Sequence, residues 1–371
     1  MDVDSGIISK MTTNVGRVSE KQDVDAAIGS DGLTAVNPGP TESGHIHPAA
    51  DIGGAAVLLN VGERIGLLPH LSEGAVVSAK FLAQTLDLPE SSLVEYLQAL
   101  MCAGLAECVS ETRGLYRASS CFEEMLHSIG YVSWTLNANR PFVEHAREFF
   151  VSRSEARARY HRDGHQIAIT SQWMGAEDFY PEARRAIFAA QPKRFVDLGA
   201  GSARLLIEVL LEFPKSTGVA LDISAKACQA AHDAAQRVGV TDRLEVVERS
   251  IESVASDPGI LEGADVIHGG FVFHDMLPHD EPTFDRVLHN SAEALAKTHG
   301  RMMVTDAAPF VQNPRERTFS AAVSFLHHFF MGRRLLSEEE WSGKFRSNGF
   351  TAIECTRLAF PTGRLFTAIK S

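Results

Sequence analysis

Residues 195–202, with the sequence FVDLGAGS, constrain the fold of this chain more than any other segment. They join a short apolar run to a helical pattern that starts near Leu205. Glycines at such a junction allow a tight turn and let a ligand lie against the backbone, at the switch point of a parallel sheet. The segment therefore predicts a nucleotide-binding turn after the first strand of an α/β domain.

Short apolar strands alternate with helices from residue 194 to the end of the chain. Strands are expected over 195–198, 218–222, 244–247, 266–268, 301–305, 353–358 and 364–369, and helices over 205–213, 225–238, 284–296 and 338–347. Such alternation is typical of a doubly wound parallel sheet, here with a terminal antiparallel hairpin. We therefore predict an α/β fold, with residues 191–371 as the cofactor-binding catalytic domain.

Two regions precede this domain. Residues 1–50 are rich in Gly, Ser, Thr, Asp and Pro without helical or strand periodicity, which is typical of a flexible tail. Residues 51–190 have a mainly helical pattern that includes two short helices, near 78–83 and 89–100, and a hairpin over 105–116. This order predicts a winged-helix-like domain.

Winged helices often bind DNA, but the charge of this chain opposes that function. No Lys or Arg lies between Lys80 and Arg113, where a groove-reading helix would need cations. The whole chain carries a formal net charge of −12, which repels phosphate. We expect no nucleic-acid partner.

Cysteine usage and hydropathy indicate a cytoplasmic protein. The five cysteines are scattered, with no CxxC pair and no zinc-like spacing. No apolar run reaches the length of a membrane span, and the N-terminus lacks the layout of a signal peptide. We expect a soluble chain that does not bind a membrane.

An acidic residue supports the prediction of a nucleotide site. Asp222 ends the second expected strand, about 20 residues beyond the glycines, where an acid suits hydrogen bonding to ribose hydroxyls. The dinucleotide fingerprint has a third glycine where this chain has Ala203, which weakens the case for a pyrophosphate cofactor. Asp197, Gly199 and Gly201, combined with Asp222, resemble motif I and the following acidic site of class I methyltransferases. The resemblance implies that these four residues bind S-adenosylmethionine (SAM).

The adenine site departs from that family's pattern. Class I methyltransferases of this type usually carry Gly-Asp after the third strand, whereas this chain carries Arg249 and Ser250. Ser250 and Ile251 are therefore the candidates for contacts to the adenine.

The resemblance covers nearly the whole chain from Asp51. The winged-helix-like region, the segment 271–275 (FVFHD) and the segment 331–334 (MGRR) resemble the dimeric small-molecule O-methyltransferases of the plant caffeate and bacterial polyketide type. The resemblance implies an enzyme that forms a homodimer through its N-terminal domain. In that family the histidine of the His-Asp pair, here His274, is the general base, a task that suits a pKa near neutrality.

A second pattern competes with O-methylation. His327 and His328 lie in a helix rich in Phe and Leu, where a buried imidazole needs a partner. In the resembled fold this helix passes the cavity that His274 faces, so a histidine from each side is a plausible pair of metal ligands.

This second pattern is similar to the metal-dependent α-keto acid C-methyltransferases of peptide-antibiotic pathways. That resemblance implies that His274 and His328 hold one iron or zinc ion, with His327 as the alternative second ligand. It also implies that Arg162 binds the carboxylate of the substrate and that Trp134 lines the substrate pocket. For the base that takes the β-proton, Asp275 and a metal-bound hydroxide are the two candidates.

Three function classes follow from these patterns. The first is methyl transfer from SAM to the β-carbon of a 2-oxo acid chelated to a His-bound metal, a reaction that would supply a β-methyl amino acid precursor for a specialised metabolite. The second is metal-free O-methylation of a small molecule with His274 as general base. The third is a binding or regulatory protein that retains the cofactor but lacks turnover. We predict the first.

Overall fold

The computed structural model describes residues 48–71 and 75–370. The expected tail over residues 1–50 lies almost entirely outside these ranges. Among the described residues, no helix is both long and apolar enough to cross a membrane.

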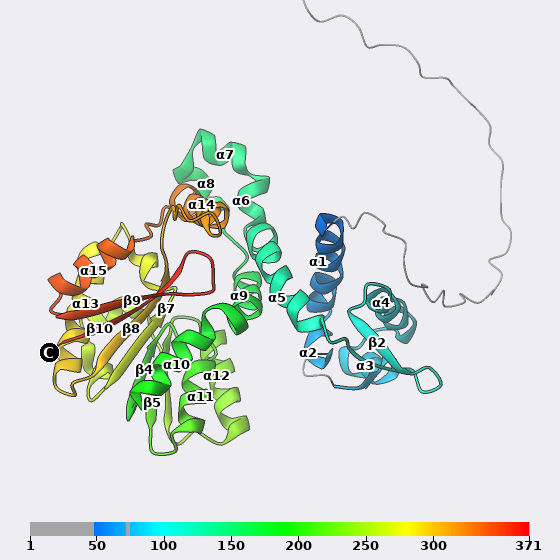
Figure 1. The fold of residues 1–371 in the computed structure, drawn as a ribbon, viewed down its shortest axis with the longest axis horizontal. Coiled ribbons are helices and arrows are strands. Elements are labelled where there is room, and N and C mark those ends of the chain that lie inside the picture. The colour runs from blue at the N-terminus through cyan, green and yellow to red at the C-terminus, as the bar shows by residue number, and fades with distance from the viewer. Residues whose placement is uncertain (1–47, 72–74, 371) are drawn as a thin grey trace, which may run out of the picture. The chain divides into compact units, whose positions relative to one another are not determined.

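A seven-stranded sheet forms the centre of the C-terminal half, with strand order β6-β5-β4-β7-β8-β10-β9 (Figure 1). Neighbouring strands from β6 to β8 are parallel, whereas β10 pairs antiparallel with both β8 and β9. The strands are β4 (Arg194–Leu198), β5 (Thr217–Asp222), β6 (Leu244–Glu248), β7 (Val266–Gly270), β8 (Arg301–Ala307), β9 (Ala352–Arg357) and β10 (Gly363–Ile369). The predicted doubly wound parallel sheet with its terminal antiparallel hairpin is confirmed.

Helices cover both faces of this sheet (Figure 1). One face carries α10 (Tyr180–Ala190), α11 (Arg204–Glu212) and α12 (Ala225–Val238), and the other carries α13 (Glu281–Ala296) and α15 (Glu338–Ser347). Local signals set the helix ends: Ser224 and Ser337 are N-caps whose hydroxyls accept from backbone N–H groups, and Gly239 ends α12 with a φ of +74°. Both sheet faces are therefore buried, as a parallel sheet requires.

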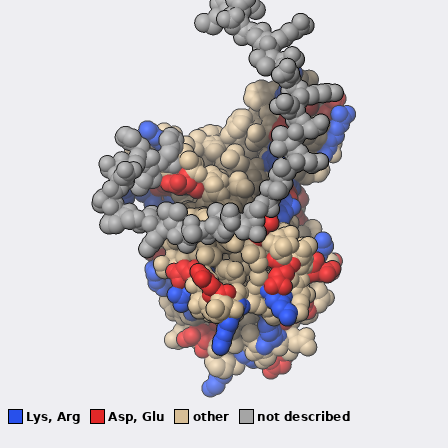
Figure 2. All heavy atoms as spheres, turned by 90° about the vertical axis from the view of Figure 1, so that its right-hand side faces the viewer, with Lys and Arg blue, Asp and Glu red and all other residues tan. Residues whose placement is uncertain are grey.

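The N-terminal region matches the expected helix-turn-helix and wing. It contains α1 (Pro48–Arg64), α2 (Leu68–Leu71), β1 (Val77–Ser78), α3 (Ala79–Leu86), α4 (Glu90–Cys102), β2 (Ala106–Ser110) and β3 (Leu115–Ala118). Where Figure 2 leaves the surface uncovered, basic and acidic side chains are interspersed and no purely basic patch gathers.

The middle of the chain supplies helices that connect the two regions. They are α5 (Phe122–Ser133), α6 (Arg140–Glu144), α7 (Ala146–Val151), α8 (Arg153–Arg159) and α9 (Gly164–Asp178). Helix α5 contacts both α1 and α9. The division at residue 190 between two domains stays a prediction, because residues 47–371 form one compact unit.

Two π-helical segments interrupt the regular helices. The segment η2 (Trp134–Ala138) follows α5, and η6 (Leu326–Met331) follows α14 (Arg317–Phe325). In space η6 contacts α8, more than 160 residues earlier in the chain, and Figure 1 shows α14 beside α8. Such segments occur often at functional sites, and these two carry candidate site residues.

Candidate functional site

The loop after β4 has the geometry of a cofactor-binding turn. Gly199 and Gly201 have φ values of +77° and +56°, which side chains of L residues rarely adopt. A Cβ at Gly199 would lie 2.5 Å from Val272 Cγ1. Gly199 N and Ala200 N both donate to Leu221 O, at 2.7 and 3.0 Å. The loop is therefore held against the end of β5.

Asp222, at the end of β5, connects the loop after β4 to the loop after β5 through hydrogen bonds. Its Oδ2 accepts from Gly201 N at 2.9 Å, and its Oδ1 accepts from Ser224 N at 2.9 Å. Each carboxylate oxygen has a second lone pair, so the group can still accept from ribose hydroxyls.

Asp197 has a partner that the sequence analysis missed. Its Oδ1 lies 2.8 Å from Nδ1 of His268, and both side chains are buried. His268 Nε2 lies 3.5 Å from Thr305 Oγ1. The three residues cross the carboxyl ends of β4, β7 and β8. The available signal was a histidine inside the otherwise apolar strand β7.

His274 lies between two carboxylates in the short 3₁₀ turn η5 (Phe273–Met276). Its Nδ1 is 2.8 Å from Oδ1 of Asp306, which is 1% exposed at the end of β8. Its Nε2 is 3.3 Å from Oδ1 of Asp275. Because the buried carboxylate fixes the Nδ1 hydrogen, Nε2 is the nitrogen free for chemistry.

His327 faces His274 directly. Their ring centroids lie 4.9 Å apart with the planes at 90°. His327 Nδ1 donates to Val323 O at 2.8 Å, and Trp134 stacks on the ring at 6.5 Å. The side chain is only 4% exposed. Burial, and to a smaller extent His274, lower the pKa of His327 well below its ordinary value.

Arg333 and Arg162 lie near the His274–His327 pair. Arg333 Nη1 lies 3.0 Å from Asp275 Oδ1. Within residues 48–71 and 75–370, Arg162 has no hydrogen-bond or ion-pair partner for its guanidinium. Burial, and then repulsion from Arg333, lower the pKa of Arg162 to about 10, which leaves it charged at neutral pH.

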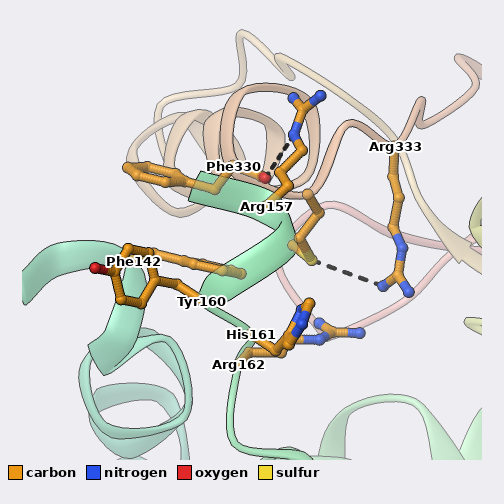
Figure 3. Close-up of a pocket in the computed structure, with 8 residues that line it drawn as sticks. Phe142, Arg157, Tyr160, His161, Arg162, Phe330 and Arg333 are labelled. Carbon is orange, nitrogen blue, oxygen red and sulfur yellow. Dashed lines mark hydrogen bonds between the residues drawn. The ribbon is translucent and has the colours of Figure 1, made fainter. Parts of the chain in front are cut away.

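Both arginines line a cavity of about 190 Å³. Figure 3 shows Arg162 and Arg333 on one side of this cavity and the rings of Phe142 and Tyr160 on the other. The full lining is Phe142, Arg157, Tyr160, His161, Arg162, Phe330, Met331 and Arg333. The cavity thus combines a cationic side with an aromatic side.

Comparison with known proteins identifies the chemistry. Residues 196–301 match the family model described as "Methyltransferase domain". The chain is also 26% identical over 315 residues to the methyltransferase ungE' of Aspergillus campestris, an alignment that covers 81% of this chain and 89% of that protein.

The chain is a SAM-dependent methyltransferase.

Solved structures agree on the fold of this methyltransferase. RosA of Streptomyces davawensis, an N,N-8-amino-8-demethyl-D-riboflavin dimethyltransferase, matches with a TM-score of 0.54 and 18% identity, over 87% of this chain and 97% of that one. PigF, solved with SAH, matches with a TM-score of 0.54 and 21% identity, over 85% and 96% of the two chains. These similarities show a class I, O-methyltransferase-like fold. They agree with SAM as the cofactor of this chain.

The structure gathers the four predicted cofactor residues, Asp197, Gly199, Gly201 and Asp222, at the ends of β4 and β5, and their contact with SAM stays a prediction. Ser250 and Ile251 are half-buried where the short turn η3 (Ile251–Ala255) begins, after β6. Because β6 pairs with β5, both lie at the same edge of the sheet. Their contact with adenine stays a prediction.

His328 is not where the prediction placed it. Its side chain is exposed, and it is His327 that is buried against His274. The resemblance pointed to His328, with His327 as the alternative, and in the π-helical segment η6 it is His327 that faces inward. If a second histidine acts in this methyltransferase, the geometry assigns that role to His327.

The other predicted site residues are placed as follows. Arg162 lines the cavity, and Asp275 joins His274 to Arg333. Trp134 packs on His327 and is not among the residues that line the cavity. Their roles in the reaction stay predictions.

Asp306 was missed by the sequence analysis. The available signal was its position at the carboxyl end of β8, because β8 is the neighbour of β7, the strand that leads to His274. The carboxyl ends of parallel strands meet at one edge of the sheet. Arg333 entered the sequence analysis only within the segment 331–334, since nothing in the sequence shows that it reaches Asp275.

In the part of the chain that the structure describes, the predicted metal site has few protein side chains that could bind the ion. Among the described residues, no group of three or more His, Cys, Asp and Glu side chains is placed to hold a metal ion. Both His274 and His327, however, have Nδ1 engaged by an acceptor, which leaves an Nε2 lone pair on each. Two imidazole nitrogens suit iron or zinc, and oxygen atoms from water or substrate would have to complete the shell.

Proposed function

We propose that this methyltransferase methylates the β-carbon of a small 2-oxo acid, with His274 and His327 as the ligands of one iron or zinc ion. The observation that carries the proposal is the Arg162 guanidinium, which lines the cavity without a hydrogen bond or ion pair among the described residues and lies close enough to His327 to lower its pKa. The charge of Asp275 acts on Arg162 from a distance but forms no ion pair with it, and Arg333 repels it, so the largely buried cation has no direct partner within the described ranges. A substrate carboxylate would supply that partner. A phenol or amine acceptor would leave Arg162 unpaired.

The histidine pair supports the choice of a 2-oxo acid. The C–H beside a ketone is a far weaker acid than a phenol, so its ionisation needs stronger stabilisation of negative charge. A metal ion bound at the two Nε2 atoms would supply Lewis acidity next to the keto oxygen. The Nδ1 contacts to Asp306 and Val323 hold both rings in the required tautomer.

Asp275 is the proposed base. Its carboxylate is 43% exposed and lies against Arg333, so it can take the β-proton and release it to solvent. The carbanion electron pair then forms the new C–C bond to the SAM methyl group. The S–CH₃ bond breaks, and its electron pair stays on sulfur in S-adenosylhomocysteine.

Metal-free O-methylation is the second candidate function. It is favoured by the 2.8 Å contact between His274 Nδ1 and the buried Asp306, which resembles a base held by an orienting acid. In that reaction His274 Nε2 takes a hydroxyl proton, and Asp306 stabilises the imidazolium.

An assay of matched acceptors separates the two functions. The enzyme is supplied with SAM and either a series of 2-oxo acids or a series of phenols, with and without a chelator, and the position of the new methyl group is determined by NMR. The proposal expects β-methyl 2-oxo acids and loss of turnover in chelator. Methylated phenols that form equally well in chelator would overturn it in favour of O-methylation.

A further inference from the structure

The segment η6 decides which of two adjacent histidines faces His274. It continues α14 without a break and ends at Gly332, whose φ is +71°. A π-helical turn contains one residue more than an α-helical turn, so it rotates the following side chains by about 100° relative to an unbroken α-helix. His327 is buried and His328 is exposed in this register. A change in register would turn His327 away from His274.

Arg157 closes the end of this segment from a different helix. From α8, its Nε donates to Phe330 O at 2.9 Å, and its Nη2 donates to Phe329 O at 2.7 Å and to His328 O at 3.3 Å. The last carbonyls of a helix lack partners within it, and a cation is favourable there. Arg157 thus acts as a C-terminal cap supplied by a segment remote in sequence.

Gly332 makes room for this cap. A Cβ at this position would lie 2.7 Å from Arg157 Nη1. Arg157 also lines the same cavity as Arg162, five residues further along the chain. Figure 3 shows its guanidinium directed at Phe330 O and away from Arg162. Arg157 therefore links the side of the cavity that carries Arg162 to η6, which carries His327.

We propose that Arg157 is a positioning residue for methyl transfer, which fixes the register of residues 326–331 and so holds His327 against His274. The inference rests on the proposed function, because it requires that His327 acts in the reaction. Arg153 is the matched control. It lies on the same helix and contacts η6 through the ring of Phe329, at 4.8 Å, and among the described residues it donates no hydrogen bond to the carbonyls of η6.

A double-mutant cycle tests the proposal. Arg157→Met is expected to lower kcat about tenfold with the Kd for SAM unchanged, since small displacements of reacting groups are costly. Arg157→Lys keeps a cation and is expected to recover part of the loss, and Arg153→Met is expected to stay within about twofold of wild type. In a His327→Ala background, Arg157→Met should cause no further loss, because its effect passes through His327.

The outcomes are distinguishable. If the losses from Arg157→Met and His327→Ala multiply in the double variant, Arg157 acts on general structure and the proposal is overturned. Wild-type kcat in both Arg157 variants, beside a strong loss in His327→Ala, also overturns it while leaving the proposed function intact. Full activity of His327→Ala overturns the proposed function itself. Should Arg157→Met fail to fold, the same cycle is run with Arg157→Lys.

Discussion

At the scale of single residues, the site is a set of charges and lone pairs held in fixed directions. Asp306 orients His274, Arg333 pairs with Asp275, and Arg162 is the proposed partner of a substrate carboxylate. The sequence could indicate His274, Asp275 and Arg162 because a family pattern marks them. It could not show their contacts, since these join positions far apart in the chain.

Removing the carboxylate behind His274 should slow the reaction without weakening cofactor binding. Asp306→Asn keeps the shape of the side chain but no longer fixes the imidazole tautomer, and losses of about 100-fold or more in kcat are expected from such a change. Steady-state kinetics beside calorimetric titration of SAM measure both quantities. An unchanged kcat would show that His274 does not act through Asp306.

Substitution of Arg162 should act on the acceptor. Arg162→Gln is expected to raise the KM for a 2-oxo acid by about tenfold or more, because a charge-assisted hydrogen bond is lost, while the Kd for SAM stays the same. Arg159→Gln is the control, since Arg159 is exposed at the end of α8. Equal effects of the two variants on KM would contradict a role for Arg162 in binding the carboxylate.

At the scale of elements, cap residues and strand alternation made much of the catalytic half predictable. The expected bounds of α12 and α15 coincide with the observed ones, because Ser224, Gly239 and Ser337 mark their ends. The π-helical segments were not predictable, since periodicity assumes a constant number of residues per turn. Periodicity therefore could not decide between His327 and His328, and the resemblance favoured His328.

The loop after β4 offers a test of the cofactor site at this scale. Gly199→Ala should raise the Kd for SAM by about tenfold or more, because the new Cβ displaces Val272 and the loop with it. Gly239→Ala has a closely similar φ but no atom within 4 Å of the new Cβ. Gly239→Ala should lose about 1 kcal/mol of stability and Gly199→Ala more, because of the contact with Val272, and only Gly199→Ala should lose affinity for SAM. Equal Kd values, measured by calorimetry, would argue against the predicted SAM loop.

At the scale of the whole molecule, we predict a homodimer. Val57 and Val61 lie four residues apart on α1 and are 65% and 43% exposed, which leaves an apolar stripe on the N-terminal region. Light scattering on the full chain should give the mass of two chains. The double variant Val57→Asp, Val61→Asp should then give the mass of one. A monomeric wild-type chain would contradict the predicted assembly.

The central claim is that His274 and His327 share one metal ion beside the carboxylate site. Elemental analysis of the purified enzyme, measured beside His327→Ala and His328→Ala, tests it most directly. The two substituted histidines are adjacent in the sequence, but only His327 lies against His274. About one iron or zinc per chain in the wild type and in His328→Ala, with loss in His327→Ala, is the predicted result. Active enzyme with no metal in any of the three, even after reconstitution, would contradict the claim and return His274 to the role of general base.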